Sequence, residues 1–147
     1  ALALGAQGIH CGTSFLATRE SFAHALHKER VIAAHAEDTV HTDAFAINWP
    51  PGSPVRVLRN EVTDSLNNQL WGYNPESIVR QVVGEEEGRP LYLFSTDSPL
   101  RSMTGNLERL ALFAGQVAGQ INSQPDAGER VTTIVAEAET VLAKLQS

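Results

Sequence analysis

The sequence predicts an α/β fold, of which these 147 residues hold only one end. Three observations support this prediction. The stretch 8–12 is apolar enough for a buried strand and leads directly into a Gly-Thr pair. The first five residues, ALALG, are typical of the last turn of a helix that ends at a left-handed Gly5. No predicted strand lies nearby to flank 8–12 in a parallel sheet, so we expect the sheet to lie upstream.

The composition limits the classes of function. Asp and Glu number 17 against 11 Lys and Arg, a formal net charge of −6, which argues against nucleic acid or an anionic membrane as a partner. No apolar stretch approaches the ~20 residues that a membrane span needs. The single cysteine, Cys11, excludes an internal disulfide and fits a reducing compartment. We therefore expect a cytoplasmic protein.

The first half of the chain alternates between strand and helix patterns. In order, the residue types predict a strand over 6–11, a helix over 21–36, and strands over 39–42 and 54–59. Ser21 is the expected N-cap of the helix. A Pro- and Gly-rich stretch is expected to connect the two later strands.

The second half is predicted to be helical. An Asn-Pro-Glu sequence is typical of a helix start and predicts a helix over 74–88. A further helix is expected over 106–121, largely buried because apolar residues surround it, and Gly115 within it indicates close packing. The last helix is expected to begin at Asp126, which with Glu129 has the spacing of a capping box. Its apolar positions recur at helical spacing.

Gly12 and Thr13 are candidates for an anion site. The N–H groups at the start of a helix are free and lie at the positive end of its dipole, and a glycine permits close approach of a ligand. From these residues alone a plain turn is favoured over a phosphate site, and both stay open. His24 and His27 lie three residues apart, but no acid at helical spacing accompanies them, so no metal site is expected.

Four blocks, in the right order along nearly the whole chain, resemble the nitronate monooxygenases. The blocks are ALALGAQGIHCGTSFLATRES, PVRVLRN, TGNLERLALFAGQVAGQI and the VAEAE of the last helix. That family, formerly called 2-nitropropane dioxygenases, also contains a flavin-dependent enoyl reductase branch. The span between Asn60 and Ser102 matches less clearly.

The resemblance implies the C-terminal part of a TIM (β/α)8 barrel with part of a smaller inserted substrate domain, and FMN as cofactor. Residues 1–37 would be the end of the barrel, comprising its last strand, phosphate loop and helix. Residues 38–102 would be a substrate-domain-like or peripheral segment, and 103–147 would be C-terminal helices that pack on the barrel. Gly12 and Thr13 match the pair that holds the FMN phosphate, which reverses the preference in favour of a phosphate site.

The implied activity is the oxidation of alkyl nitronates or nitroalkanes with O₂, so the partner is a small-molecule substrate. The family's catalytic histidine lies upstream, and no residue of this chain is assigned a catalytic role. His10 and Cys11 stand where members commonly carry Gln and Met. Two other functions stay open: the reductase branch, which needs a nicotinamide donor, and a non-catalytic binding module. The strand edge at 8–12 favours association into a homo-oligomer.

Overall fold

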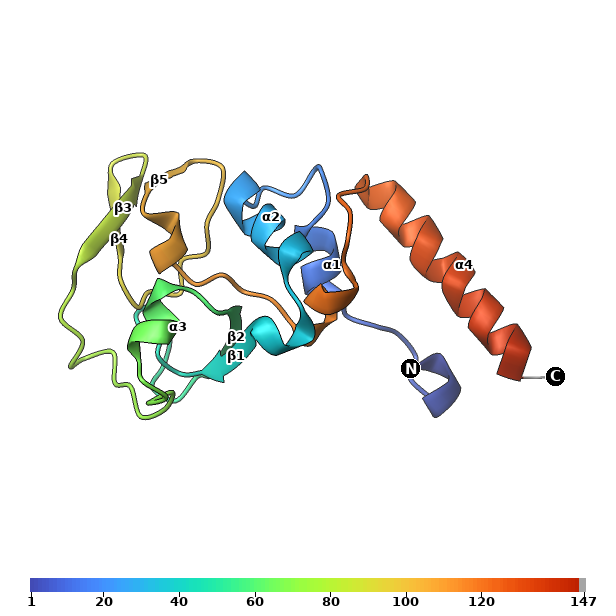
Figure 1. The fold of residues 1–147 in the computed structure, drawn as a ribbon, viewed down its shortest axis with the longest axis horizontal. Coiled ribbons are helices and arrows are strands. Elements are labelled where there is room, and N and C mark those ends of the chain that lie inside the picture. The colour runs from blue at the N-terminus through green and yellow to red at the C-terminus, as the bar shows by residue number, and fades with distance from the viewer. Residues whose placement is uncertain (146–147) are drawn as a thin grey trace.

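Two small antiparallel sheets, several short helices and one long helix make up the protein (Figure 1). The computed structural model describes residues 1–145. In Figure 1 the strands lie at the left, α1 (Gly12–Leu16) and α2 (Ala25–Ala33) in the middle, and α4 (Ala127–Leu145) at the right. Helices and strands are mixed along the chain, as the α/β prediction requires.

The first sheet confirms two strand predictions. β1 (Thr39–Thr42) pairs antiparallel with β2 (Val55–Leu58), and Val40 lies opposite Val57. Both valines are buried, because alternate β-branched side chains point into the core. α3 (Glu61–Ser65) follows β2, and its Val62 belongs to the same buried cluster as Val57.

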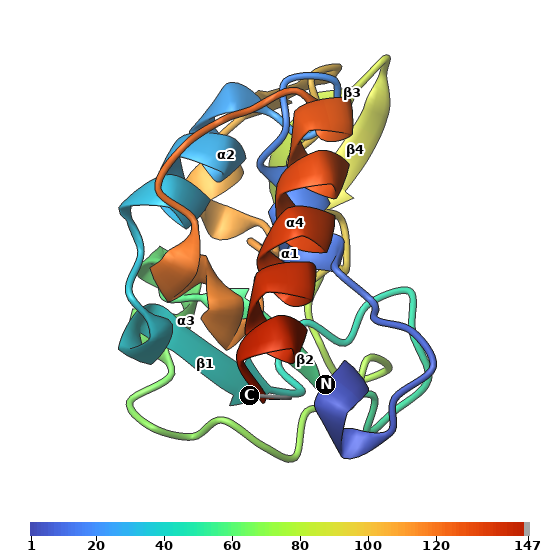
Figure 2. The same cartoon turned by 90° about the vertical axis from the view of Figure 1, so that its right-hand side faces the viewer.

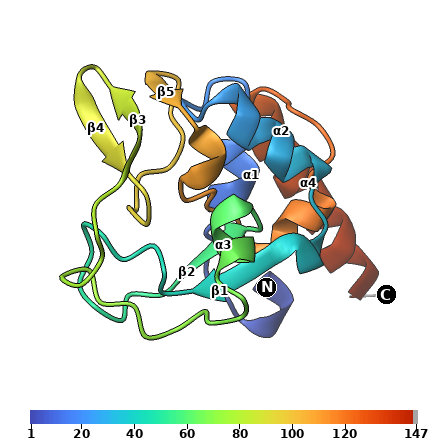
Figure 3. The ribbon, with the colours of Figure 1, turned by 60° about the vertical axis from the view of Figure 1, so that its left-hand side comes forward.

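The second sheet replaces a predicted helix. β3 (Val82–Glu86) is its central strand, between β4 (Arg89–Tyr92) and β5 (Met103–Gly105), and the β3–β4 hairpin extends from one end of the molecule (Figure 3). The prediction of a helix over 74–88 is therefore wrong.

The turn chemistry explains the error. Glu87 and Gly88 both have positive φ, 50° and 83°, and such two-residue turns match the twist of an antiparallel hairpin. The predicted helix start is real but local, since the Asn74 side chain accepts a hydrogen bond from the Glu76 N–H at 3.0 Å within a single turn. Without a continuing apolar face, no helix propagates from that turn.

The stretch 106–121 is buried but is not one helix. It consists of two 3₁₀ turns, Leu107–Arg109 and Gln116–Gln120, with an extended segment between them. That segment bonds to the backbone around β2: the N–H of Leu58 donates to the carbonyl of Leu112 at 2.8 Å. The predicted burial is correct, whereas the predicted helix is wrong because backbone partners outside the segment are available.

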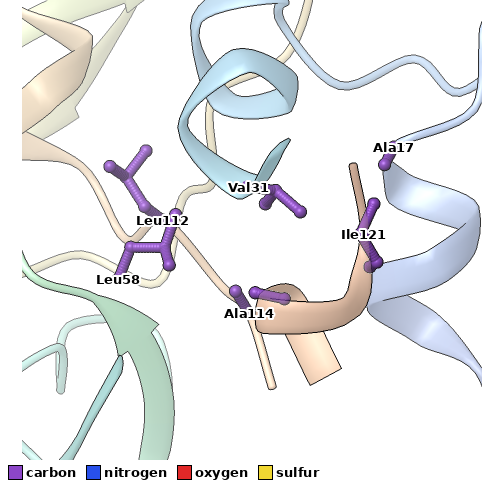
Figure 4. Packing of buried hydrophobic residues seen from close by; sticks show 7 residues of the cluster. Ala17, Val31, Leu58, Leu112, Ala114 and Ile121 are labelled. Carbon is purple, nitrogen blue, oxygen red and sulfur yellow. The ribbon is translucent and has the colours of Figure 1, made fainter. Parts of the chain in front are cut away.

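One core cluster lies between β2, α2 and this extended segment (Figure 4). Leu58 and Leu112 face Val31 of α2, and Ile121 and Ala17 close the cluster on the side of α1. All five side chains are at most 3 % exposed. Residues far apart in the sequence thus share one core.

α2 is shorter than the helix predicted over 21–36. Its N-cap is His24, whose Nδ1 accepts a hydrogen bond from the Leu26 N–H at 3.2 Å. Ser21, the expected cap, instead accepts a hydrogen bond from the Ala23 N–H at 3.2 Å in the preceding turn. The helix therefore starts one turn later than expected.

The first eleven residues differ from the predicted strand. Gly5 ends a 3₁₀ turn, Leu2–Leu4, in the left-handed conformation with φ 90°, as expected. Residues 6–11 form no ladder, and 6–10 are exposed. Because a strand is stabilised by backbone hydrogen bonds to a neighbour, and none of the described strands lies beside this stretch, the strand prediction is wrong for this structure.

α4 confirms the prediction of a last helix, and it lies along one side of the body (Figure 2). The expected cap, Asp126, forms an ion pair with Arg19 at 2.8 Å, and the Glu20 carboxylate accepts from the Ala127 N–H at 2.9 Å. None of the residues of α4 is buried. No helix within residues 1–145 combines the length and apolar character that crossing a bilayer needs.

Candidate functional site

Gly12 and Thr13 form the first two residues of α1. The N–H groups of Gly12, Thr13 and Ser14 donate to no acceptor within residues 1–145. The first N–H groups of a helix lack a partner because the residues four positions earlier lie outside the helix. The first N–H of the helix with a partner is that of Phe15, which donates to the Cys11 carbonyl at 3.3 Å. The sequence-predicted pair therefore offers adjacent free donors to an anion.

The surface at Gly12 is open. A Cβ atom built at this position meets no atom within 4 Å among the described residues, and Gly12 is exposed. Its backbone is therefore accessible to a ligand at a distance that a side chain would prevent. The backbone of Gly12 is not in the left-handed region, so this position does not need glycine for its conformation. The absence of a side chain matters here because it lets a ligand come close to the backbone.

The Thr13 side chain is fixed by a distant segment. Its hydroxyl oxygen accepts a hydrogen bond from the Gly115 N–H at 2.9 Å, across 102 positions of sequence. A hydroxyl that accepts in this way keeps its own hydrogen for donation to a ligand. From the sequence, Gly115 was expected to allow close packing of a helix. A glycine within an apolar stretch is the one sequence feature that could have indicated this contact.

His27 is the most deeply buried ionisable residue of α2, with no exposed surface. Its Nε2 lies 3.0 Å from the Phe113 carbonyl oxygen and its Nδ1 lies 3.2 Å from the Ser98 Oγ. Because a carbonyl only accepts, Nε2 carries the proton and the Ser98 hydroxyl donates to Nδ1. Burial lowers the pKa of His27 from 6.5 to about 4, against a smaller opposing effect of the Phe113 carbonyl.

The other histidines are separate. His24 caps α2, and His41 packs edge-to-face against Trp71 with ring centroids 5.2 Å apart. No group of three or more His, Cys, Asp or Glu side chains within residues 1–145 could hold a metal ion. His10 is exposed and Cys11 is half-buried, immediately before the candidate phosphate site.

The fold of this chain is similar to part of a solved structure. The structure of FabK from Thermotoga maritima superposes with a TM-score of 0.69 and 26 % sequence identity, covering 99 % of this chain and 41 % of that chain. A probable nitronate monooxygenase from Staphylococcus haemolyticus is 27 % identical over 139 residues, 95 % of this chain and 34 % of its own length.

A third relative has a different named activity. A 5-hydroxy-7a-methyl-1-oxo-octahydro-1H-indene-4-carboxyl-CoA dehydrogenase of Mycobacterium tuberculosis is 28 % identical over 97 % of this chain and 46 % of its own length. The chain thus spans less than half the length of each of these proteins. By fold and by sequence, this mixed α/β chain is thus similar to FabK and to proteins that are named as a monooxygenase and a dehydrogenase.

The family follows from a direct match. The model of the nitronate monooxygenase family covers residues 1–137, and the chain belongs to that family. This confirms the resemblance that the four sequence blocks indicated.

Proposed function

We propose that this chain is part of an FMN-dependent nitronate monooxygenase, which oxidises alkyl nitronates or nitroalkanes with O₂. The observation that carries the proposal is the row of free N–H groups at Gly12, Thr13 and Ser14, at a glycine that is open to a ligand. Family membership and the nitronate monooxygenase named among the relatives support it. When bound, FMN would supply the redox chemistry of this reaction.

The residues of this chain would hold the FMN phosphate. The N–H groups of the first turn of α1 donate to its oxygens, and the positive end of the peptide dipoles favours its negative charge. The Thr13 hydroxyl adds a donor whose position is set by the hydrogen bond from Gly115. Gly12 allows the phosphate to approach the backbone.

The proposal includes the fold of the whole enzyme. Residues 1–37 would complete a TIM barrel, 38–102 would belong to an inserted or peripheral segment, and 103–147 would pack on the barrel. In that setting residues 6–11 would gain the parallel neighbours that a strand requires. The catalytic base and the rest of the flavin pocket would come from the part of the family domain that this chain does not cover.

The test is flavin retention of Gly12→Val in the protein expressed with its complete family domain. A branched side chain at Gly12 places two methyl groups between the backbone and the phosphate, so we expect at least a tenfold loss of bound FMN. Gly128→Val is the matched control, since Gly128 has equally open surroundings on α4. Unchanged flavin content in purified Gly12→Val protein would refute the assignment.

A second candidate function is the reductase branch of the family. The relative named as a dehydrogenase shows that oxidoreductases of other named chemistry match this chain over nearly its whole length. Comparing the oxidation of NADH or NADPH with nitronate-dependent O₂ uptake separates the two activities. A protein that retains no flavin and has neither activity would be the non-catalytic binding module.

A further inference from the structure

Three cationic side chains line one pocket beyond the C-terminal end of α1. Arg19 follows that helix, Lys28 belongs to α2 and Arg101 precedes β5, and together with His24 and Gln124 they surround about 420 Å³. The chain as a whole carries a formal net charge of −6. A local concentration of positive charge on such a protein calls for an explanation.

Lys28 is the most unusual member. Its side chain is only 3 % exposed, and its Nζ donates to the carbonyl oxygens of Thr18 and Arg19 at 2.7 and 3.1 Å. No carboxylate within residues 1–145 forms an ion pair with it. Burial and then the nearby Arg101 guanidinium lower the pKa of Lys28, and Glu20 opposes them. One N–H of the ammonium keeps no described acceptor.

The Arg101 guanidinium is held by two hydrogen bonds and keeps N–H groups that have no described acceptor. Its Nη2 donates to the carbonyl oxygens of Arg19 and Ser21 at 2.6 and 2.8 Å, which uses both hydrogens of that nitrogen. The hydrogens on Nη1 and Nε donate to no acceptor among the described residues. The guanidinium is therefore oriented by the backbone while its other edge stays available.

The carboxylates nearby are already engaged. Asp126 pairs with Arg19 at 2.8 Å, and Glu20 accepts from the Ala127 N–H. Three cationic side chains thus have two carboxylates nearby. Asp126 is paired with Arg19, and Glu20 caps the start of α4. The pocket keeps positive charge and free N–H donors.

We propose that this pocket binds a phosphate group, free or as part of a phosphate monoester, between Arg101, Lys28 and Arg19. A tetrahedral dianion matches a point charge and a guanidinium edge that approach from different segments, and it would relieve the repulsion between Lys28 and Arg101. The pocket is separate from the candidate FMN site, because neither Gly12 nor Thr13 lines it. The inference does not depend on the proposed function.

Calorimetric titration of the purified chain at constant ionic strength tests the proposal, with inorganic phosphate and glycerol 3-phosphate as probes. We expect saturable binding that weakens at least tenfold in Arg101→Gln. We expect the same loss in Arg19→Gln, and because the Arg19 side chain is 62 % exposed, its replacement leaves the packing intact. Arg101→Lys keeps the charge but loses the guanidinium edge, so it should bind more weakly than the unmodified chain and more tightly than Arg101→Gln. Tighter binding of glycerol 3-phosphate identifies a monoester as the ligand, and equal affinities identify free phosphate.

The matched control is Arg109→Gln, which removes the same charge from an arginine paired with Glu61 elsewhere on the surface. It should bind phosphate as the unmodified chain does. Absence of saturable binding in the unmodified chain would overturn the proposal. Equal binding by the unmodified chain and Arg101→Gln would also overturn it, and would point to another site such as the start of α1.

Discussion

Single polar side chains hold the extended segment 110–115 in place. The Thr13 hydroxyl binds the Gly115 N–H, the His27 ring binds the Phe113 carbonyl, and the Asn60 Nδ2 donates to the Leu110 carbonyl at 2.9 Å. Buried backbone groups outside regular structure need such partners. At the scale of the residue, these contacts connect the candidate phosphate site to the core.

Protonation of His27 should destabilise the fold. The unfolded chain binds a proton at this imidazole near pH 6.5, whereas the folded chain does so only near pH 4, so stability falls as the pH decreases through that window. The shift corresponds to a loss of about 3 kcal/mol. Urea unfolding at pH 7 and pH 4 should show this loss.

The contribution of His27 can be isolated with His27→Gln. Glutamine can donate to the Phe113 carbonyl and accept from Ser98 as the neutral imidazole does, but it does not titrate. Its stability should therefore fall by about 3 kcal/mol less between the two pH values. An equal fall in both proteins would show that His27 is protonated without cost. His35→Gln, at an exposed histidine, serves as control.

Asn60→Ala should lower the free energy of unfolding by about 2–3 kcal/mol. The Asn60 Oδ1 caps α3 by accepting from the Val62 and Thr63 N–H groups, both at 3.1 Å, and its Nδ2 satisfies the Leu110 carbonyl. The substitution removes the cap and leaves a buried carbonyl unpaired. Chemical denaturation measures the loss, and Ser77→Ala, which removes an exposed hydroxyl, should change stability by less than about 0.5 kcal/mol. Similar values for the two variants would contradict this assignment.

The elements of this protein differ in how they are stabilised. α4 has the clearest helical pattern of the chain but contributes no buried residue, whereas the 110–115 segment has no regular structure and contributes much of the core. Apolar residues of α4 instead face an open groove of about 540 Å³, which Leu2 and Ile9 line from the opposite side. Helical periodicity alone therefore does not indicate burial.

Two leucine-to-alanine substitutions should separate these elements. Leu112→Ala removes a side chain with no exposed surface and should cost about 2–5 kcal/mol. Leu142→Ala, in the half-buried wall of the groove, should cost less than about 1 kcal/mol in this chain. Thermal melting gives both values. If the Leu142 variant loses as much as the Leu112 variant, α4 is packed against another surface in solution.

At the scale of the whole molecule, this chain supplies one part of the proposed enzyme. It spans 34 % of the nitronate monooxygenase relative and 41 % of FabK, and its sheets are small and antiparallel. A flavin ring needs walls on more than the phosphate side, and one short helix start does not supply them.

The isolated chain should therefore neither retain FMN in stoichiometric amount nor oxidise nitronates. Flavin titration followed by nitronate-dependent O₂ uptake measures both properties, and the protein with its complete family domain is the positive control. Stoichiometric FMN and turnover by the isolated chain would show that the 147 residues contain a complete site.

The sequence by itself determined the features that depend on local chemistry. The strands at 39–42 and 54–59, the left-handed Gly5 and the long last helix follow from alternation, turn residues and helical spacing. The family followed from the order of four sequence blocks. Gly12-Thr13 was also proposed from the sequence, because a glycine at a helix start has a chemical meaning without knowledge of its neighbours.

Only the tertiary structure decided what depends on distant partners. The stretch 106–121 is rich in apolar residues, a pattern that fits a buried helix and a buried extended segment equally well. Hydrogen bonds to the backbone around β2 favour the extended segment. Residues 6–11 have the composition of a strand but no neighbour to pair with. The contact between Thr13 and Gly115, and the meeting of Lys28 with Arg101, join positions far apart in the chain. Residue spacing along the sequence carries no information about such contacts, because folding creates them.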